Sequence, residues 1–391
     1  MGVQKNKKLY RSTISIFLII LICVLISLGL NKIYRVVYEK MDTIDKKMFE
    51  ELSKIYEKFN ESSSNLWNNN YKFNEKPLIL IRTNREKGIV RKYSYVINVE
   101  EFKNSIFSKK VNIPDYLKLP TVYRVNNLNL NMISTWIPSN FGTVNINTNK
   151  VFYFKYNPQM MENPELYFDF SSFLLHESFH TYNQKNWIYD ENDGEYVENY
   201  PVNIENYALM GVEFKLLDKC MESNNKSEIS KYLRQWTLIR NYRYKKWPQL
   251  LAETNTEAIE GTARYIEYKY SKLSGGKLTV LANKEAPYHV TFIHAYNCIA
   301  DNIAESPAYL ERPIKYETGA AVCLIMDKLN IEWKKYIEDS REKRGKTQYE
   351  ILKYYYDISY KNYDEISNVK SENDYEELLK KGEKIVNLYN K

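Results

Sequence analysis

The chain has 391 residues and contains little glycine, proline, cysteine or histidine. With 12 Gly and 11 Pro it offers few obligatory turns, which favours long helices over a sandwich or barrel of many short strands. Collagen-like and linker-like chains are excluded for the same reason. Aromatic residues make up 15% of the chain, and 36 of them are Tyr, which excludes a disordered protein. The composition therefore predicts a folded, helix-rich body.

Cysteine is also scarce, with four residues in all. Cys220, Cys298 and Cys323 are an odd number at wide, irregular spacing, which is not typical of a disulfide framework. They lack the close pairing of a thiolate metal site as well. We expect them to be small buried hydrophobic residues, whereas Cys23 stands within an apolar run.

The excess of positive over negative charge is almost confined to the start of the chain. The net charge is +7, and residues 1–40, with seven Lys and Arg against one Glu, contribute +6 of it. A nucleic-acid-binding protein places a basic stripe on its folded body. Because the rest of this chain is nearly neutral, we expect no nucleic-acid partner.

Long hydrophobic runs are absent except at one place. Residues 12–30 read STISIFLIILICVLISLGL and contain no charge, a length close to that of a membrane-crossing helix. The sequence predicts a transmembrane anchor here, with a cleaved signal peptide as the alternative. Lys and Arg are slightly denser before the run than after it. We therefore expect a single-pass protein of the cell membrane, with a cytoplasmic N-terminus and an extracellular catalytic body.

In the remaining chain, sequence patterns typical of strands are followed by patterns typical of helices, which predicts an α+β fold. Short alternating runs lie between 77 and 157 and indicate about four strands. Helical periodicity is found at 41–66, 164–187, 199–223, 227–246, 249–272, 313–330 and 373–390. The predicted organisation is a basic tail (1–11), the membrane segment (12–30), a helical stalk (31–76), a catalytic body (77–330) and a helical C-terminal subdomain (331–391).

One segment, FLLHESFHTYNQ, holds half of the chain's four histidines. His176, Glu177 and His180 have the order H-E-x-x-H, and positions i and i+4 of a helix share one face. Both imidazoles can therefore bind one Zn²⁺, and Glu177 beside it can act as a general base toward a metal-activated water. The other two, His289 and His294, are five residues apart and diverge around a helix.

A zinc site of this kind needs a third protein ligand. The segment LLAETNTEAIEGTARYIEYKY places Glu253, Glu257 and Glu260 at i, i+4 and i+7, on one face of a predicted helix. Its apolar neighbours indicate partial burial, where like charges require a nearby cation. Either a metal ion or the arginines Arg240 and Arg243 would serve, and both Glu257 and Glu260 remain candidates for the third ligand.

Two further segments resemble a known family. The run EGTARY, which starts at Glu260, resembles the E-G-x-x-x-Y segment of gluzincin metallopeptidases of the aminopeptidase N and leukotriene A4 hydrolase group. The run YETG, which starts at Tyr316, is similar to their Y-E-x-G segment. The resemblance implies a zincin-like catalytic body that acts on a peptide or protein substrate. It further implies Zn²⁺ held by His176, His180 and Glu260, with Glu177 as general base and Tyr316 as a donor to the oxyanion of the tetrahedral intermediate.

The sequence also departs from that family. The interval between His180 and Glu260 is several times longer, which predicts an inserted pair of helices over about 199–246. The exopeptidase motif G-x-M-E-N has only a partial counterpart in MMEN at 160–163, so aminopeptidase specificity is not implied. Tyr182 and Tyr265 remain alternative oxyanion donors.

The predicted function is that of a membrane-anchored, extracytoplasmic zinc metallopeptidase. The alternative is a catalytically silent zincin-like ectodomain that serves as a binding or sensing module. Glu177 favours the first function, because a binding module has no chemical need for a base between two metal ligands.

Overall fold

The structure is a computed structural model that describes residues 2–33, 36–84, 91–103, 105–126, 129–189, 197–304, 306–359 and 362–389. The chain forms two compact units. The first comprises Met1–Ser63 and Asn69–Ser178, and the second comprises Ser64–Asn68 and Phe179–Lys391. The division falls inside helix α4 (Phe170–Tyr182), which is continuous across it.

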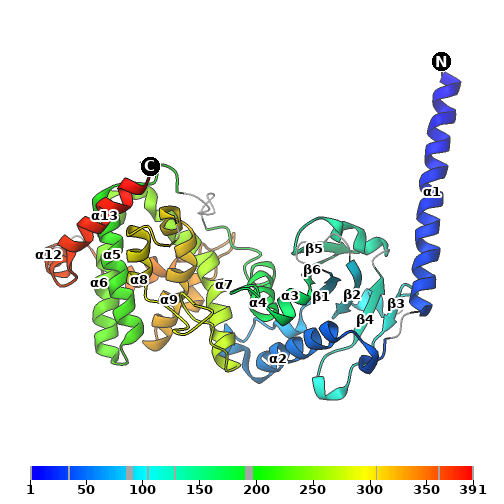
Figure 1. The fold of residues 1–391 in the computed structure, drawn as a ribbon, viewed down its shortest axis with the longest axis horizontal. Helices are drawn as coiled ribbons and strands as arrows, with labels where there is room; N and C mark the ends of the chain where they lie inside the picture. Colours follow the sequence, from blue (N-terminus) through cyan, green and yellow to red (C-terminus); the bar gives the residue numbers. More distant parts are fainter. Residues whose placement is uncertain are drawn as a thin grey trace. The chain divides into compact units, whose positions relative to one another are not determined.

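The first unit is built on a mixed sheet with strand order β3-β4-β2-β1-β6-β5 (Figure 1). Strands β1 and β6 are parallel, and the other neighbouring pairs are antiparallel. Its strands are β1 (Leu78–Thr83), β2 (Arg91–Ile97), β3 (Ser108–Lys110), β4 (Val122–Asn126), β5 (Phe141–Ile146) and β6 (Asn149–Tyr156). Strand β6 continues through the short helix α3 (Pro158–Glu162) toward α4.

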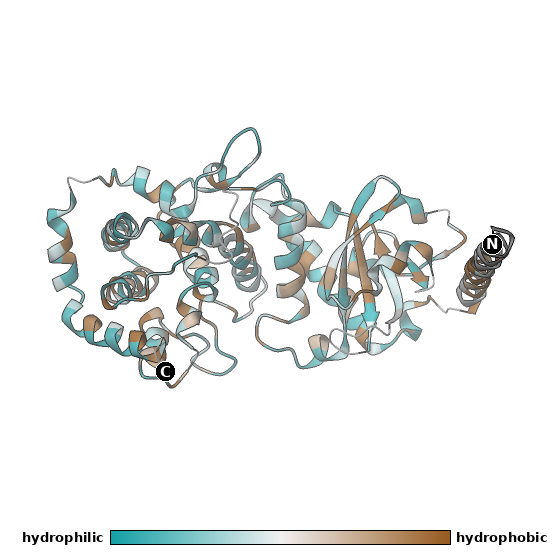
Figure 2. Ribbon diagram, turned by 90° about the horizontal axis from the view of Figure 1, so that it is seen from above, coloured by the Kyte–Doolittle hydropathy of each residue, from teal (hydrophilic) through white to brown (hydrophobic). Residues whose placement is uncertain are grey.

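Both faces of the central strands are covered, so β1 is buried at every position. Figure 2 shows several hydrophobic segments among the strands of this sheet. On one face, Ile79 and Ile81 pack with Met132 of a 3-10 helix (Leu130–Trp136). On the other face, Phe154 packs against the rings of Phe170 and Phe173 from α4. Strand residues alternate between the faces of a sheet, so Tyr156 lies on the same face as Phe154 and also contacts the ring of Phe170.

Helix α2 (Thr43–Leu66) belongs to the first unit as far as Ser63 and packs on the sheet through an amphipathic face. Phe49 lies edge-on to Tyr95 of β2, with 4.8 Å between the ring centroids. Next to this contact the buried carboxylate of Asp45 accepts hydrogen bonds from the hydroxyls of Tyr95 (2.9 Å) and Tyr156 (2.8 Å). These bonds satisfy a charge that burial alone would make costly.

The prediction of a transmembrane anchor over 12–30 is wrong. The sequence does form helix α1 (Gly2–Ile33). A crossing requires about 20 consecutive apolar residues, and in the described part of the chain no helix combines the necessary length with the necessary hydrophobicity. The predictions that depended on this anchor are wrong as well. They are the single-pass topology, the cytoplasmic N-terminus with an extracellular body, and the contact of residues 12–30 with a membrane.

The second unit is helical (Figure 1). Helices α7 and α9 form its most extensive pair, and α5 packs against both α6 and α13. Its helices are α5 (Ile204–Glu222), α6 (Lys226–Lys246), α7 (Glu253–Leu273), α8 (Phe292–Ala300), α9 (Pro313–Lys328), α10 (Lys334–Ile337), α11 (Gln348–Tyr355), α12 (Asp364–Ser371) and α13 (Tyr375–Tyr389).

The predicted α+β order, strands first and helices after, is confirmed. The expected helical pair over 199–246 forms as α5 and α6. Two strand predictions differ in detail. The run at 143–156 folds back on itself as the hairpin β5–β6, and the run at 121–137 is a strand only as far as Asn126, after which it turns into the 3-10 helix.

Candidate metal centre

Helix α4 carries the H-E-x-x-H sequence. Its first turn is held by Asp169, whose Oδ1 accepts the backbone N–H of Ser172 at 3.0 Å. Leu174, Leu175 and Phe179 are fully buried and fix the orientation of the helix. The histidines therefore lie along one stripe, with His176 buried and His180 half-buried, and Glu177, which follows His176 in the sequence, is half-buried.

Helix α7 carries the three predicted glutamates, and the structure separates their roles. Glu257 is fully buried, and both of its oxygens accept hydrogen bonds from Arg240 at 2.6 Å. Glu253 pairs with Arg243 at 2.8 Å and is fully buried too. The arginine alternative is therefore correct for these two carboxylates, and Glu257 does not join the histidines.

Glu260, one turn further along α7, faces the histidines. Its Oε2 lies 3.3 Å from Nε2 of His180. His176, His180 and Glu260 each offer one ligand atom, and these three atoms lie within 4.8 Å of one another. This is the one group of this kind among the described residues.

The donor set fits Zn²⁺. Two imidazole nitrogens and one carboxylate oxygen are the composition of a catalytic zinc site, which keeps its fourth position open. Ligand bonds of about 2.0–2.2 Å at tetrahedral angles put neighbouring ligand atoms about 3.3–3.6 Å apart. The His180–Glu260 separation of 3.3 Å matches that spacing. Because the carboxylate and both imidazoles point to one place, the arrangement suits a cation.

Gln184 supports His180 from one turn further along the chain, a residue whose role sequence reasoning missed. Its Oε1 lies 2.5 Å from Nδ1 of His180, and its Nε2 donates to the carbonyl of Ile259 (2.8 Å) and to Oγ1 of Thr262 (2.7 Å). The i, i+4 spacing from His180 is the signal that could have found it. An amide oxygen at Nδ1 places the proton there and leaves Nε2 to bind a metal.

Tyr316 lies beside the third ligand. Its hydroxyl accepts a hydrogen bond from Nη1 of Arg312 at 2.9 Å, while Nη2 of the same arginine lies 3.5 Å from Oε1 of Glu260. Burial and the neighbouring Glu260 carboxylate raise the pKa of Tyr316 to about 12. Arg312, which the sequence analysis did not single out, stands at i−4 from Tyr316 on the same helical edge and links these two residues.

The alternative donor Tyr265 does not belong to this group. It is fully buried and donates to Oδ2 of Asp327 at 2.6 Å. Burial and that carboxylate raise the pKa of its hydroxyl. Tyr182 lies two residues beyond His180 and therefore points away from the stripe. His289 and His294 are both exposed, and neither belongs to the metal-competent group.

A buried ion network supports the start of α7. Each of its side chains is at most 1% exposed, and its formal charges cancel. Its members are Glu213, Arg240, Arg243, Glu253, Glu257 and Lys315. Burial alone would raise the pKa of Glu253, but Arg243 and Lys315 lower it to about 2. The network joins α5, α6, α7 and α9, and so fixes the helix that presents Glu260.

Comparison of the chain with protein-family models, with curated proteins and with solved structures found no match. The resemblance to gluzincins therefore stays a prediction that depends on three short segments.

Proposed function

We propose that this protein is a Zn²⁺-dependent peptidase that hydrolyses peptide bonds. The observation that carries the proposal is the convergence of His176 and His180 of α4 with Glu260 of α7, which lies about 80 residues further along the chain. The three residues offer ligand atoms within 4.8 Å of one another. A zinc ion bound there would polarise the scissile carbonyl and lower the pKa of water toward neutrality.

Glu177 is the proposed general base. It follows His176 directly on α4, beside the stripe formed by the two histidines, and it is half-buried and therefore partly accessible. In the proposed reaction it takes a proton from the attacking water and later passes that proton to the leaving amine. This order of events restores Glu177 to its ionised form at the end of each turnover.

Tyr316 is the proposed oxyanion donor. A phenol is protonated at neutral pH, so its O–H can donate to negative charge that develops on the carbonyl oxygen. Arg312 donates to the phenol oxygen and thereby orients the hydroxyl without consuming its proton. Removal of one oxyanion donor typically costs about 3–4 kcal/mol of transition-state stabilisation, or 10²–10³ in kcat.

The test combines metal analysis with a peptide-library digest of the full chain. We expect about one zinc per chain and cleavage that stops on chelation and returns on addition of zinc. The variant Glu177→Gln should retain zinc and lose turnover. A chain that binds zinc but cleaves no peptide would instead support a silent binding module, and a chain that binds no divalent metal would overturn the proposal.

A further inference from the structure

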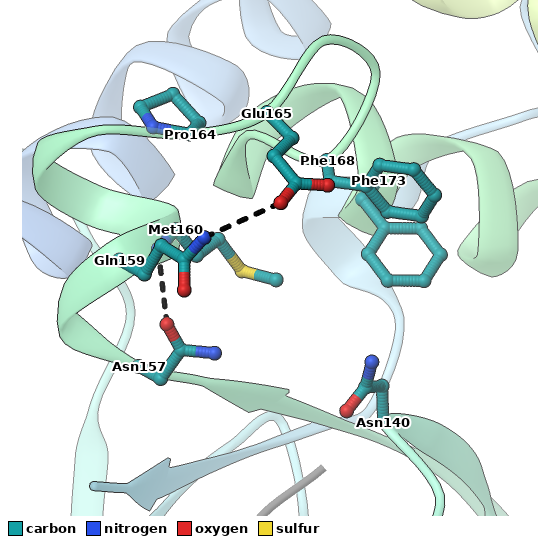
Figure 3. A pocket seen from close by; sticks show the side chains of 8 residues that line it. All are labelled: Asn140, Asn157, Gln159, Met160, Pro164, Glu165, Phe168 and Phe173. Carbon is teal, nitrogen blue, oxygen red and sulfur yellow. Dashed lines mark hydrogen bonds between the residues drawn. The ribbon is translucent and has the colours of Figure 1, made fainter. Parts of the chain in front are cut away.

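A cavity of about 250 Å³ lies in the first unit, between the end of β6 and the start of α4 (Figure 3). Met160 and Asn157 form its buried base, and the rings of Phe168 and Phe173 form one wall. Small-molecule sites commonly enclose about 300–1,000 Å³, so this cavity has the size of a single side chain and not of a cofactor.

Its position connects the cavity to the proposed reaction. Phe173 stands on α4 at i−3 from His176 and i−4 from Glu177. Residues at these spacings are neighbours on one helical face, about 5–6 Å apart at Cβ. Phe173, a wall residue of the cavity, therefore lies one helical turn from the proposed general base on α4.

The wall consists of aromatic rings in edge-to-face contact. Phe173 lies 5.3 Å from Phe168, 5.6 Å from Phe141 and 5.4 Å from Phe154, measured between ring centroids. Phe168 is 49% exposed, so one face of this cluster is not covered by the chain itself. An additional ring would extend the same edge-to-face pattern, which is the preferred geometry of aromatic pairs.

The polar groups around the cavity disfavour the binding of a negatively charged side chain. Asn157 is nine-tenths buried or more, and its Oδ1 accepts the backbone N–H of Met160 at 3.0 Å. At the rim, the carboxylate of Glu165 accepts a hydrogen bond from Nε2 of Gln159 at 3.5 Å. Among the described residues that line the cavity, none is a cation. An acidic side chain would meet the like charge of Glu165 and no cation among these lining residues.

We propose that this cavity is the specificity pocket of the peptidase and that it binds an aromatic side chain of the peptide substrate. The role in specificity rests on the proposed function. The binding of an aromatic side chain rests only on the cavity.

The first experiment tests the pocket without catalysis. The full chain with ¹³C-methyl methionine is titrated with N-acetyl-phenylalanine amide and, separately, with N-acetyl-alanine amide. The Met160 methyl signal is assigned by its loss in Met160→Leu. We expect saturable ring-current shifts of that signal with the phenylalanine probe alone, and weaker binding to Phe168→Ala. An unmoved Met160 signal would overturn the pocket, even if the protein cleaves peptides.

The second experiment tests specificity. Quenched peptides that differ only in having Phe, Ala or Glu at one position are compared by kcat/KM. We expect Phe to be preferred, Glu to be disfavoured, and the Phe-over-Ala ratio to fall about three- to tenfold in Phe168→Ala, the effect expected for one ring contact. Tyr116→Ala, at another exposed aromatic residue of the same unit, should keep the ratio. Cleavage without a preference for Phe contradicts the specificity role, whereas binding without any cleavage contradicts the proposed function.

Discussion

Gly261 of α7 and Gly319 of α9 meet backbone to backbone. A Cβ atom added to Gly261 would lie 2.6 Å from Cα of Gly319, and one added to Gly319 would lie 2.6 Å from the carbonyl oxygen of Glu257. A Cβ atom essentially never lies within 3.0 Å of another heavy atom to which it is not bonded, so both positions require glycine for packing. The close approach brings the helix that carries Glu260 against the helix that carries Tyr316, which explains why each motif contains a glycine.

The variants Gly261→Ala and Gly319→Ala should each lower the free energy of unfolding by about 2–3 kcal/mol, because backbone atoms cannot give way to the added methyl as a side chain can. Urea unfolding measures this loss. Lys272→Ala, at an exposed position of the same helix, is the matched control and should be close to neutral. Unchanged stability in either glycine variant contradicts the packing.

Glu260→Gln should abolish tight zinc binding, whereas Glu257→Gln should retain it. Glu257 is held by Arg240 and by Oγ1 of Thr318, which donates to it at 2.6 Å, so it has no part in the metal centre. Glu257→Gln should still lower the free energy of unfolding, by about 3 kcal/mol, because it leaves Arg240 partly unpaired. Zinc stoichiometry and urea unfolding on the same samples separate the two effects. The opposite pattern of zinc loss would make Glu257 the ligand.

Gln184→Leu should weaken zinc binding about 10–100-fold, since a bond that orients a ligating histidine typically contributes that much. The measurement is competition with a chelator of known affinity. Lys185→Ala, at the exposed neighbouring position, should bind zinc like the original chain. Equal affinity in Gln184→Leu would show that the amide does not orient His180.

The stability of the protein should depend on pH through Glu253. Its pKa is about 2 in the folded chain, against an ordinary value of 4.5, so the folded state favours the ionised form. The ion pairs of Glu253 therefore stabilise the fold fully above pH 4.5, and this contribution of about 3 kcal/mol is lost as the pH falls from 4.5 to 2. The stability difference between the original chain and Glu253→Gln should shrink over that window. A constant difference contradicts the prediction.

Much of the candidate site follows from helical spacing alone. His176, Glu177 and His180 share a face because the i, i+4 rule applies within one helix. The same rule could not decide between Glu257 and Glu260, since both lie on the inner face of α7. Tertiary contacts decide it, because Arg240 reaches Glu257 from α6 and leaves Glu260 facing His180.

The membrane prediction shows the opposite limit. The apolar run at 12–30 has the length and the uncharged composition expected of a membrane-crossing helix. The described helices nevertheless include none that is long and apolar enough to cross a membrane. The specificity pocket was equally beyond sequence reasoning. Met160 lies on α3, Phe168 precedes α4 and Phe173 lies on α4, and no local pattern of the sequence indicates that these residues enclose one cavity.

The most direct test of the central claim is the turnover rate of Glu177→Gln at full zinc occupancy, measured beside the original chain on the same peptide. The account predicts equal zinc content and a loss of at least about 10²-fold in kcat, because the amide cannot take the proton. Equal turnover in the two proteins would contradict the assignment of Glu177 as general base and, with it, the proposed peptidase mechanism.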